Sequence, residues 1–250
     1  MSLEVVVLGT CGGYPAAGRA CPGFLLRHDD ENLVLDLGSG ALANLLEFID
    51  ADQVGTVALS HMHYDHYVDI FGLCTARRFW EVQLDPLAAF APAGAREIIG
   101  APLSEESRPR FFECMEFQEM SGDVSIEVGG FAITAKYGVH NVDSYIYRVE
   151  VGGRSVCYSG DTDLCDALLE QARGCDLFIC EATFTSEVEA KMPGHMRASE
   201  AGHAAQEAGV KKLLLTHVWP TLSRSRAIAD AAEEYSGPVS AADERTLLDV

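Results

Sequence analysis

The alternation of apolar and polar positions divides the chain into short strands and helices. Leu3–Leu8 is a continuous apolar run that stops at Gly9, which predicts a buried strand. The stretch Thr10–Gly23 is rich in Gly, Pro and Ala and predicts a loop. Phe24–Arg27 and Leu33–Asp36 flank a polar turn and predict a hairpin of paired strands.

The rest of the chain continues this alternation. Further strands are predicted at Thr56–Leu59, Leu84–Ala91, Phe111–Phe117, Val124–Val128, Phe131–Lys136, Ser144–Val151, Ser155–Ser159, Leu177–Cys180 and Lys212–Leu215. Helices are predicted at Ala41–Ile49, Val68–Phe79, Ala95–Ile99, Leu164–Ala172, Ala198–Glu207 and from Ser225 onward. Strands and helices alternate in both halves, with neither a repeat nor a linker, which predicts one domain over residues 1–250. The expected fold class is α/β, a four-layer αββα sandwich.

Composition agrees with one large core and argues against some partners. The 250 residues are 48% hydrophobic, which is enough to fill a core of this size. Asp and Glu number 38 against 18 Lys and Arg, for a net charge of -20. Such a field repels nucleic-acid phosphates unless basic residues gather locally, and the densest basic pairs are only Arg77-Arg78 and Lys211-Lys212. The acidity is either a solubility coat or partly offset by bound divalent cations.

Cysteine usage and the N-terminal sequence indicate a reducing compartment. None of the eight cysteines forms a C-x-x-C pair, and several lie in apolar runs, so buried reduced thiols are expected. The first residues carry no basic segment followed by a signal-length apolar stretch, and no run approaches transmembrane length. We predict a cytoplasmic protein without a membrane partner.

A histidine-rich motif follows the predicted strand Thr56–Leu59. His61 and His63 are two residues apart, so in an extended backbone both side chains point to the same side and can chelate one ion. Asp65 and His66 begin the next helix and can reach a second ion. Imidazole and carboxylate ligands suit zinc, manganese or iron.

Three more candidate ligands end apolar strands far along the chain. They are His140, Asp161 and His217. Asp161 follows a strand that breaks at Gly160, where a carboxylate can give one oxygen to each of two ions. Each residue alone fits a core or surface role, but their shared position at strand ends favours a metal site. His28 and His203 match no motif and receive no role.

These motifs, in this order, resemble those of metallo-β-lactamase-fold hydrolases. The resemblance rests on Ser60–His66, His140, Ser159–Thr162 and Thr216-His217 and covers nearly the whole chain. It implies two divalent metal ions, with zinc as the default. The implied ligands are His61, His63 and His140 for one ion and Asp65, His66 and His217 for the other, with Asp161 between them.

Within that superfamily the chain is most similar to ribonuclease Z and its compact bacterial relatives. Three segments carry this likeness: Leu8–Thr10, Cys180–Phe184 and Gly194-His195 followed by Ala198-Ser199. The resemblance implies that His195 donates a proton at the scissile phosphate and that Glu181 orients it. The alternative for His195 is an exposed loop histidine.

The implied reaction is attack by a metal-bridging hydroxide on phosphorus or on a carbonyl carbon. Asp65 would serve as a ligand and as the orienting base of the nucleophile. The alkoxide leaving group of a phosphodiester needs a proton, which is the task expected of His195. A lactonase or thioesterase has less need of that donor.

Departures from ribonuclease Z point to a small substrate. The arm that grips tRNA in that family is inserted between the third-motif His and the G-D-T, but here His140 and Asp161 are only 161 − 140 = 21 positions apart. Tyr64 is bulkier than the residue usual at its position in the motif. With the acidity, these features favour a phosphodiesterase acting on a small phosphodiester such as a cyclic nucleotide. The alternatives are a tRNA 3′ endonuclease, a lactone or thioester hydrolase, and a non-catalytic scaffold.

Two further expectations concern the surface. The Gly12–Arg19 loop follows a strand end and should border the site, where Arg19 either contacts a phosphate or is plain surface, the reading we favour. Relatives are often homodimers, and Phe79 and Trp80 could serve an interface, although core packing is the expected role.

Overall fold

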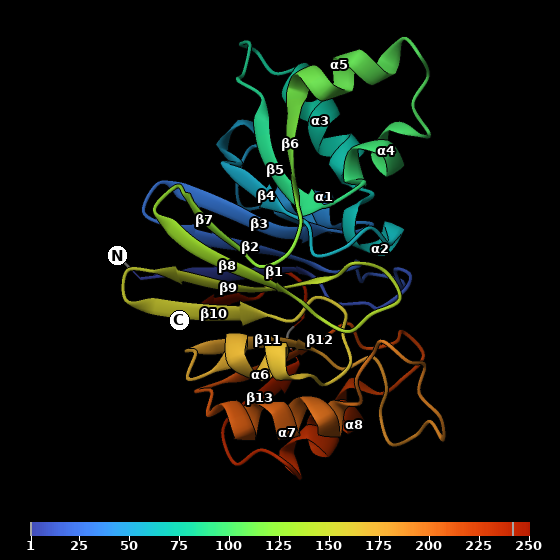
Figure 1. Ribbon diagram of the computed structural model, residues 1–250, viewed down its shortest axis with the longest axis vertical. Helices are drawn as coiled ribbons and strands as arrows, with labels where there is room; N and C mark the ends of the chain where they lie inside the picture. The colour runs from blue at the N-terminus through green and yellow to red at the C-terminus, as the bar shows by residue number, and fades with distance from the viewer. Residues whose placement is uncertain (1, 242) are drawn as a thin grey trace.

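Two β-sheets packed face to face form the centre of the protein, and helices cover both outer faces (Figure 1). The computed structural model describes residues 2–241 and 243–250. The four-layer αββα sandwich expected from the sequence is confirmed.

The first sheet contains seven strands in the order β14-β1-β2-β3-β4-β5-β6. Their bounds are β14 Leu247–Asp249, β1 Glu4–Gly9, β2 Gly23–His28, β3 Glu31–Leu37, β4 Thr56–Ala58, β5 Leu87–Pro92 and β6 Met115–Met120. The strands β3 to β6 run parallel, whereas β14, β1, β2 and β3 pair antiparallel.

The second sheet also contains seven strands, in the order β13-β12-β11-β10-β9-β8-β7. Their bounds are β13 Val239–Ala241, β12 Leu213–Thr216, β11 Leu177–Glu181, β10 Arg154–Tyr158, β9 Tyr145–Val151, β8 Phe131–Tyr137 and β7 Val124–Val128. The strands β10 to β13 run parallel, whereas β7 to β10 form an antiparallel meander. In each sheet the parallel half presents its strand ends along one edge.

Helices from the two halves of the chain cover opposite faces. On the first sheet lie α1 Ala41–Leu45, α2 Tyr64–Tyr67, α3 Ile70–Arg78, α4 Ala95–Gly100 and α5 Ser107–Cys114 (Figure 1). On the second lie α6 Asp166–Ala172, α7 Ala198–Ala208 and α8 Arg224–Ala232. A short 3₁₀ turn, Ala51–Gln53, precedes β4.

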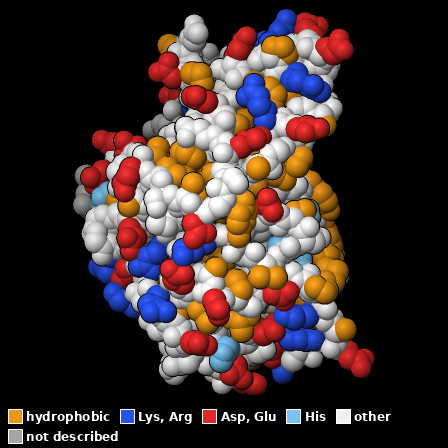
Figure 2. Space-filling view, viewed as in Figure 1, with side chains coloured by type: hydrophobic (Ala, Val, Ile, Leu, Met, Phe, Trp, Pro, Cys, Tyr) orange, Lys and Arg blue, Asp and Glu red, His pale blue; other side chains and the backbone are white. Residues whose placement is uncertain are grey.

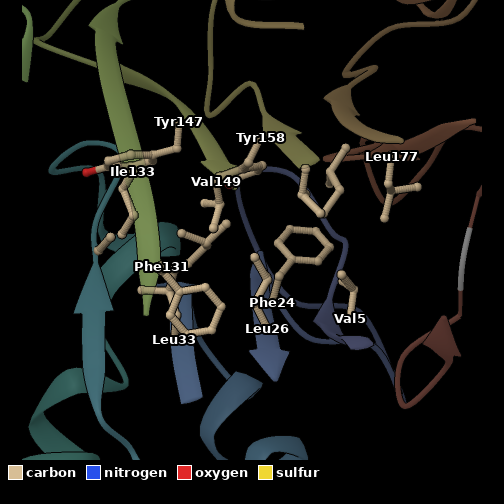
Figure 3. Packing of buried hydrophobic residues seen from close by; sticks show 14 of the residues in the cluster. Val5, Phe24, Leu26, Leu33, Phe131, Ile133, Tyr147, Val149, Tyr158 and Leu177 are labelled. Carbon is tan, nitrogen blue, oxygen red and sulfur yellow. The ribbon is translucent and has the colours of Figure 1, made fainter. Parts of the chain in front are cut away.

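Three layers of buried apolar side chains hold these elements together. The central layer fills the space between the sheets, where Phe24, Phe131 and Tyr158 interdigitate (Figure 3). A second layer packs the first sheet on its helices, and a third packs the second sheet on α6, α7 and α8. Strands buried on both faces explain the continuous apolar runs in the sequence.

Several predicted elements have different bounds in the structure. Helix α1 ends at Leu45 rather than Ile49. The strand predicted at Phe111–Phe117 begins only at Met115, because the preceding residues form the end of α5. As part of a helix, Phe111 packs its ring 5.4 Å from that of Phe71 on α3. An apolar run of this kind fits a strand or a buried helix equally well by period alone.

Two short strands near the C-terminal end were not predicted. Strands β13 and β14 have three residues each and lie at the outer ends of their sheets. Strand β14 pairs with β1, which places residues almost the whole chain apart side by side. Three residues carry too little periodicity to be recognised without their partner strand.

Of the two aromatic residues expected to pack in the core, one does so and the other does not. Trp80 is partly buried against the helical layer, as expected, but Phe79 is 77% exposed, so its predicted core packing is wrong. Phe79 caps α3 where the helix turns into solvent. The eight cysteines are free. Within the described residues, the helices are all too short or too polar to cross a membrane.

Candidate metal centre

The ends of the parallel strands bring the predicted residues together. His61 follows β4 by three residues, Asp161 follows β10, and His217 follows β12 directly. Glu181 is the last residue of β11, between β10 and β12 in the sheet. Carboxyl ends of parallel strands lie at one edge, so residues distant in sequence meet there.

The first group of candidate ligands contains three imidazoles and a carboxylate. His61, His63, His140 and Asp161 each place one ligand atom within 4.8 Å of the others. His63 Nδ1 lies 3.1 Å from His61 Nε2 and 3.2 Å from His140 Nε2. Ligands about 2.0–2.1 Å from a tetrahedral zinc ion are roughly 3.3 Å apart, so this spacing suits a shared cation.

The second group of candidate ligands lies beside Asp161 of the first. Asp65, His66 and His217 also place ligand atoms within 4.8 Å of one another. His66 Nε2 lies 3.4 Å from Asp161 Oδ1, and His217 Nε2 lies 3.2 Å from Asp161 Oδ2. Asp161 therefore stands between the two groups, as the motif resemblance implies.

Buried Asp36 orients two of these histidines. Its Oδ2 accepts from the Ser60 hydroxyl at 2.7 Å, from His66 Nδ1 at 2.7 Å and from the Tyr158 hydroxyl at 2.6 Å. Its Oδ1 accepts from the Ser60 amide at 2.6 Å. Because the Ser60 hydroxyl donates to Asp36, it accepts from His61 Nδ1, 3.0 Å away. In both rings the proton on Nδ1 leaves the Nε2 lone pair facing the candidate metal position.

Two further outer contacts have the same effect. His140 Nδ1 donates to the Gly194 carbonyl at 2.7 Å. The Thr183 hydroxyl donates to Glu181 Oε2 at 2.6 Å, so it accepts from His217 Nδ1 at 2.8 Å. Both contacts leave Nε2 unprotonated, the form in which imidazole binds a metal.

Unpartnered buried atoms show that the residues fit divalent cations. Among the described side chains, His66 Nε2, His217 Nε2 and Asp161 Oδ1 are buried without a hydrogen-bond partner. A buried polar atom without a partner costs about 1–3 kcal/mol. Three such atoms converging on one region are explained by a cation, which accepts a lone pair from each.

Electrostatics support the same reading. Burial lowers the pKa of His61, His63 and His140, which keeps these imidazoles neutral. Burial alone would raise the pKa of Asp161, but the surrounding His217, His66 and His61 hold it well below the ordinary value. Burial likewise opposes a charge on His66, yet Asp161 and Asp36 raise its pKa. The centre thus favours positive charge between its carboxylates. A divalent cation bound there also supplies positive charge.

Two residues in the centre have backbones in the left-handed region. Asp36 has φ 54° and His217 has φ 56°. A residue other than glycine in this region costs of order 1–3 kcal/mol, and such residues cluster at functional sites. Both side chains contact the centre: Asp36 Oδ2 accepts from His66 Nδ1, and His217 Nε2 lies 3.2 Å from Asp161 Oδ2.

His195 and Glu181 form the predicted pair beside the centre. His195 Nδ1 lies 3.3 Å from Glu181 Oε1 and 3.8 Å from Asp161 Oδ2. Glu181 is fully buried and accepts from the Thr162 amide at 2.8 Å and the Met196 amide at 3.1 Å. Burial alone would lower the pKa of His195, but the hydrogen bond and charge of Glu181 raise it to about 9. His195 is therefore held in the protonated form near neutral pH.

Ion pairs fix the loop that carries His195. Lys191 Nζ donates to Asp163 at 2.9 Å and to Glu200 at 2.7 Å. Asp163 also accepts from the Gly194 amide at 2.6 Å. His195 is thus a partly buried residue of an anchored loop rather than a freely exposed loop histidine.

The Gly12–Arg19 loop borders the centre, as expected, but Arg19 does not point into it. The Gly13 amide donates to Asp65 Oδ2 at 2.8 Å. A Cβ on Gly12 would lie 2.7 Å from His217 Nδ1, so the close approach requires glycine. Arg19 instead donates to the Thr10 hydroxyl at 3.2 Å and lies 3.7 Å from Glu244.

Sequence reasoning missed the supporting residues. Asp36, Ser60 and Thr183 received no role, although each contacts a predicted ligand directly. One signal was available for Asp36, because a carboxylate ends the apolar run Leu33–Leu35. Ser60 and Thr183 carry no such signal, since hydroxyl residues at strand ends are common.

The chain is similar to known proteins over most of its length. Residues 32–218 match the family described as the β-lactamase superfamily domain. An uncharacterized protein of Mycobacterium leprae is 34% identical over 256 residues, which cover 100% of this chain and 89% of that protein. The probable metallo-hydrolase YhfI of Bacillus subtilis is 31% identical over 220 residues, 86% of this chain and 87% of YhfI. Ribonuclease Z of Haloferax volcanii is 28% identical over 306 residues, 100% of this chain and 96% of that enzyme.

Solved structures share the architecture. The crystal structure of YhfI matches with a TM-score of 0.88 at 29% identity and covers 99% of both chains. The short form of human tRNase Z matches with a TM-score of 0.81 at 23% identity, again over 99% of both chains. The second likeness shows the fold alone.

Proposed function

The chain belongs to the β-lactamase superfamily, as a metal-dependent hydrolase of that fold, and on this premise we propose that it is a two-metal phosphodiesterase. Its expected substrate is a small phosphodiester such as a cyclic nucleotide. The ligands proposed are His61, His63, His140 and Asp161 for one ion, and Asp65, His66, His217 and the shared Asp161 for the other.

The position and charge of His195 support a phosphodiester as the substrate class. A histidine with a raised pKa, His195, lies 3.3 Å from buried Glu181 and 3.8 Å from the shared ligand Asp161. An alkoxide leaving group is strongly basic and needs a proton as the bond to phosphorus breaks. A protonated imidazole at this place can supply it, whereas acyl transfer from a thioester needs no such donor.

The remaining roles follow from the contacts. Divalent cations supply positive charge that stabilises an anionic transition state and makes water a better nucleophile near neutral pH. Asp65, whose Oδ2 accepts from the Gly13 amide, would orient that water and accept its proton. Asp36 and Thr183 keep the ligand imidazoles in the tautomer that can bind a cation. Glu181 orients His195 and stabilises its charge.

The size of the expected substrate rests on the segment between His140 and Asp161. This segment consists of the short strands β9 and β10, so a tRNA-gripping arm has no place in it. The net charge of -20 also disfavours long polyanions. Both features support a small molecule.

Hydrolysis by metal-loaded protein tests the proposal. Bis-p-nitrophenyl phosphate and cyclic AMP would be compared with a lactone and a tRNA precursor. His195→Ala and Asp161→Ala should abolish turnover of cyclic AMP. His203→Ala is the matched control, because His203 is exposed on α7 and pairs only with Glu207 among the ion pairs of the described chain.

The outcomes separate the candidates. Turnover of both phosphodiesters, with the cyclic AMP activity lost in the two site variants and kept in His203→Ala, supports the proposal. Turnover of the lactone alone, with His195→Ala unchanged, would contradict the phosphodiester class and the proton-donor role while leaving the metal ligands in place.

Ribonuclease Z activity is the second candidate, because a ribonuclease Z is among the relatives that span the whole chain. The motifs that resemble ribonuclease Z also imply the Glu181–His195 pair. This candidate requires a basic surface for RNA, so cleavage of the tRNA precursor that weakens steeply with salt would favour it.

A further inference from the structure

The candidate metal centre meets solvent at three of its histidines. His61, His66 and His217 are buried, whereas His63, His140 and His195 are partly exposed. A substrate must therefore approach along the side formed by these three imidazoles. In Figure 2, histidine atoms are visible on the right-hand side of the molecule, with hydrophobic side chains beside them.

Along the sequence, exposed hydrophobic residues lie within three positions of each of these three histidines. Tyr64 follows His63, Val139 and Val142 flank His140, and Met192 precedes His195. Together with Tyr14, these four residues make up half of the ten large hydrophobic side chains that are exposed in the described chain. Surface hydrophobic residues scattered singly need no explanation, but a group around a reactive centre marks a binding surface.

On one side of the centre, three aromatic side chains contact one another or the same glycine, Gly13. The Tyr64 hydroxyl donates to the Gly13 carbonyl at 2.8 Å, while the Gly13 amide holds Asp65. A Cβ on Gly13 would lie 2.9 Å from the Trp219 ring, so the indole packs directly on this glycine. Trp219 in turn meets the Tyr14 ring edge-on, with centroids 5.7 Å apart.

Tyr64 is 60% exposed, although its hydroxyl is hydrogen-bonded. A tyrosine anchored at its tip with its ring in solvent is already fixed in orientation. Such a ring can stack on a planar group without losing further side-chain freedom.

The neighbouring basic side chains are already engaged. Lys191 pairs with Asp163 and Glu200, Arg19 pairs with Glu244, and Arg197 donates to the carbonyl groups of residues 185, 188 and 189. These cations are therefore not available to grip additional phosphates. The exposed hydrophobic side chains named above therefore remain to contact a ligand beside the centre.

We propose that Tyr14, Tyr64 and Trp219 form an aromatic subsite that holds the nucleobase of a nucleoside phosphodiester against the metal centre. This inference rests on the proposed function and specifies its substrate class. Stacking of a base on an aromatic side chain tolerates every base, so the subsite selects nucleosides without choosing strongly among them.

Three esters with the same leaving group test the subsite. They are the p-nitrophenyl esters of thymidine 5′-phosphate, of methyl phosphate and of hexyl phosphate. We expect kcat/KM for the thymidine ester to exceed that for the methyl ester by about 10-fold, the smaller end of what one stacked base contributes. Tyr64→Ala and Trp219→Ala should bring this ratio close to one, chiefly through KM.

Two further variants separate stacking from other effects. Tyr64→Phe keeps the ring and loses the hydrogen bond to Gly13, so the ratio should persist. Phe79→Ala removes an exposed aromatic ring outside the centre and should leave the ratio and the turnover unchanged.

A ratio lost equally in Tyr64→Phe and Tyr64→Ala would overturn stacking on Tyr64. A hexyl ester preferred as strongly as the thymidine ester would overturn nucleobase recognition in favour of a general apolar surface.

Fluorescence gives a second measurement that does not depend on turnover. The chain has two tryptophans, so Trp80→Phe leaves Trp219 as the sole indole. We expect adenosine 5′-phosphate to quench its emission and ribose 5-phosphate to leave it unchanged. Equal responses to both ligands would overturn the subsite. If neither p-nitrophenyl nor cyclic esters are hydrolysed while quenching persists, the proposed function fails and the subsite stands.

Discussion

The Nδ1 atom of His195 lies near two carboxylates, those of Glu181 and Asp161, which have different proposed tasks. Glu181 is bonded on both oxygens and buried, so it acts as a fixed negative charge. Asp161 belongs to the ligand groups. The contribution of the His195 proton to turnover can therefore be measured.

Removal of His195 should depend on the leaving group. With cyclic AMP, whose leaving group is an alkoxide, His195→Ala should lower kcat by about 10² to 10⁴-fold. With bis-p-nitrophenyl phosphate the leaving phenolate is stable without a proton, and the loss should be much smaller. Steady-state kinetics with the two substrates measures the difference, and equal losses would contradict the proton-donor role.

The pH profile should report the same proton. The pKa of His195 is raised to about 9, and the donor must be protonated, so activity on cyclic AMP is kept below that pH and lost as pH rises through it. Glu181→Gln removes the charge that raises this pKa, so the alkaline limb should move to lower pH by about one unit or more. Glu207→Gln, beside exposed His203, is the matched control and should leave the limb in place. An unmoved limb in Glu181→Gln would assign it to another group.

Asp36 connects elements of both sheets. It lies near the end of β3 and accepts from Ser60 after β4, from His66 in α2 and from Tyr158 at the end of β10. The carboxylate therefore supports the fold and the candidate ligands at once. Measuring both the free energy of unfolding and the metal affinity of Asp36 variants separates these two contributions.

Asp36→Asn should weaken both properties. An amide places a donor against groups that already donate, so we expect a loss of about 3 kcal/mol in the free energy of unfolding and of about 10 to 100-fold in metal affinity. Tyr158→Phe removes one of the donors and should cost about 1 kcal/mol. Chemical denaturation and metal titration measure the two effects. Wild-type metal affinity in Asp36→Asn would show that the residue serves the fold alone.

Close packing of the Gly12 loop gives another test at this scale. A Cβ at position 12 would press on His217 Nδ1 and on its carbonyl oxygen at 2.6 Å. Gly12→Ala should displace His217 and lower metal affinity by about 10-fold or more. Gly100→Ala, where the nearest atoms are at 3.5 Å, is the control. A metal titration that does not distinguish the two variants would contradict the proposed role of His217.

The sequence predicted most elements because their apolar periods are long and clear, and it failed where period alone is ambiguous. Phe111 and Phe112 fit a strand equally well, and only packing on Phe71 and Phe117 explains the helix. The residues of the candidate centre were predictable because imidazoles and carboxylates at strand ends are unusual. Their supports were not, since the role of Thr183 depends on a hydrogen bond between segments 34 residues apart.

At the scale of the whole molecule, the candidate ligands join the two sheets. His61 to His66 follow β4 in the first sheet, whereas Asp161 and His217 follow strands of the second. A cation bound by both sets stabilises the packing of one sheet on the other, because the unfolded chain cannot hold the ligands together.

Metal removal should therefore lower thermal stability. At a metal concentration of about 1,000 times Kd, binding contributes about 4 kcal/mol. For a chain of this length the melting temperature should fall by about 10 °C on treatment with a chelator. Differential scanning calorimetry with and without added zinc or manganese measures the shift. The same melting temperature in Asp161→Ala with and without chelator is the expected control, and no shift in the wild-type protein would contradict a shared site.

The division of the ligands along the chain has a consequence for biosynthesis. Translation delivers the first proposed ligand set when Asp161 has left the ribosome, but the second set stays incomplete until His217 emerges with β12. The second proposed ligand set is therefore completed 217 − 161 = 56 residues later in synthesis than the first. Chains truncated between these two positions would hold the first proposed ligand set without the second, and we expect them to bind less metal than the full chain.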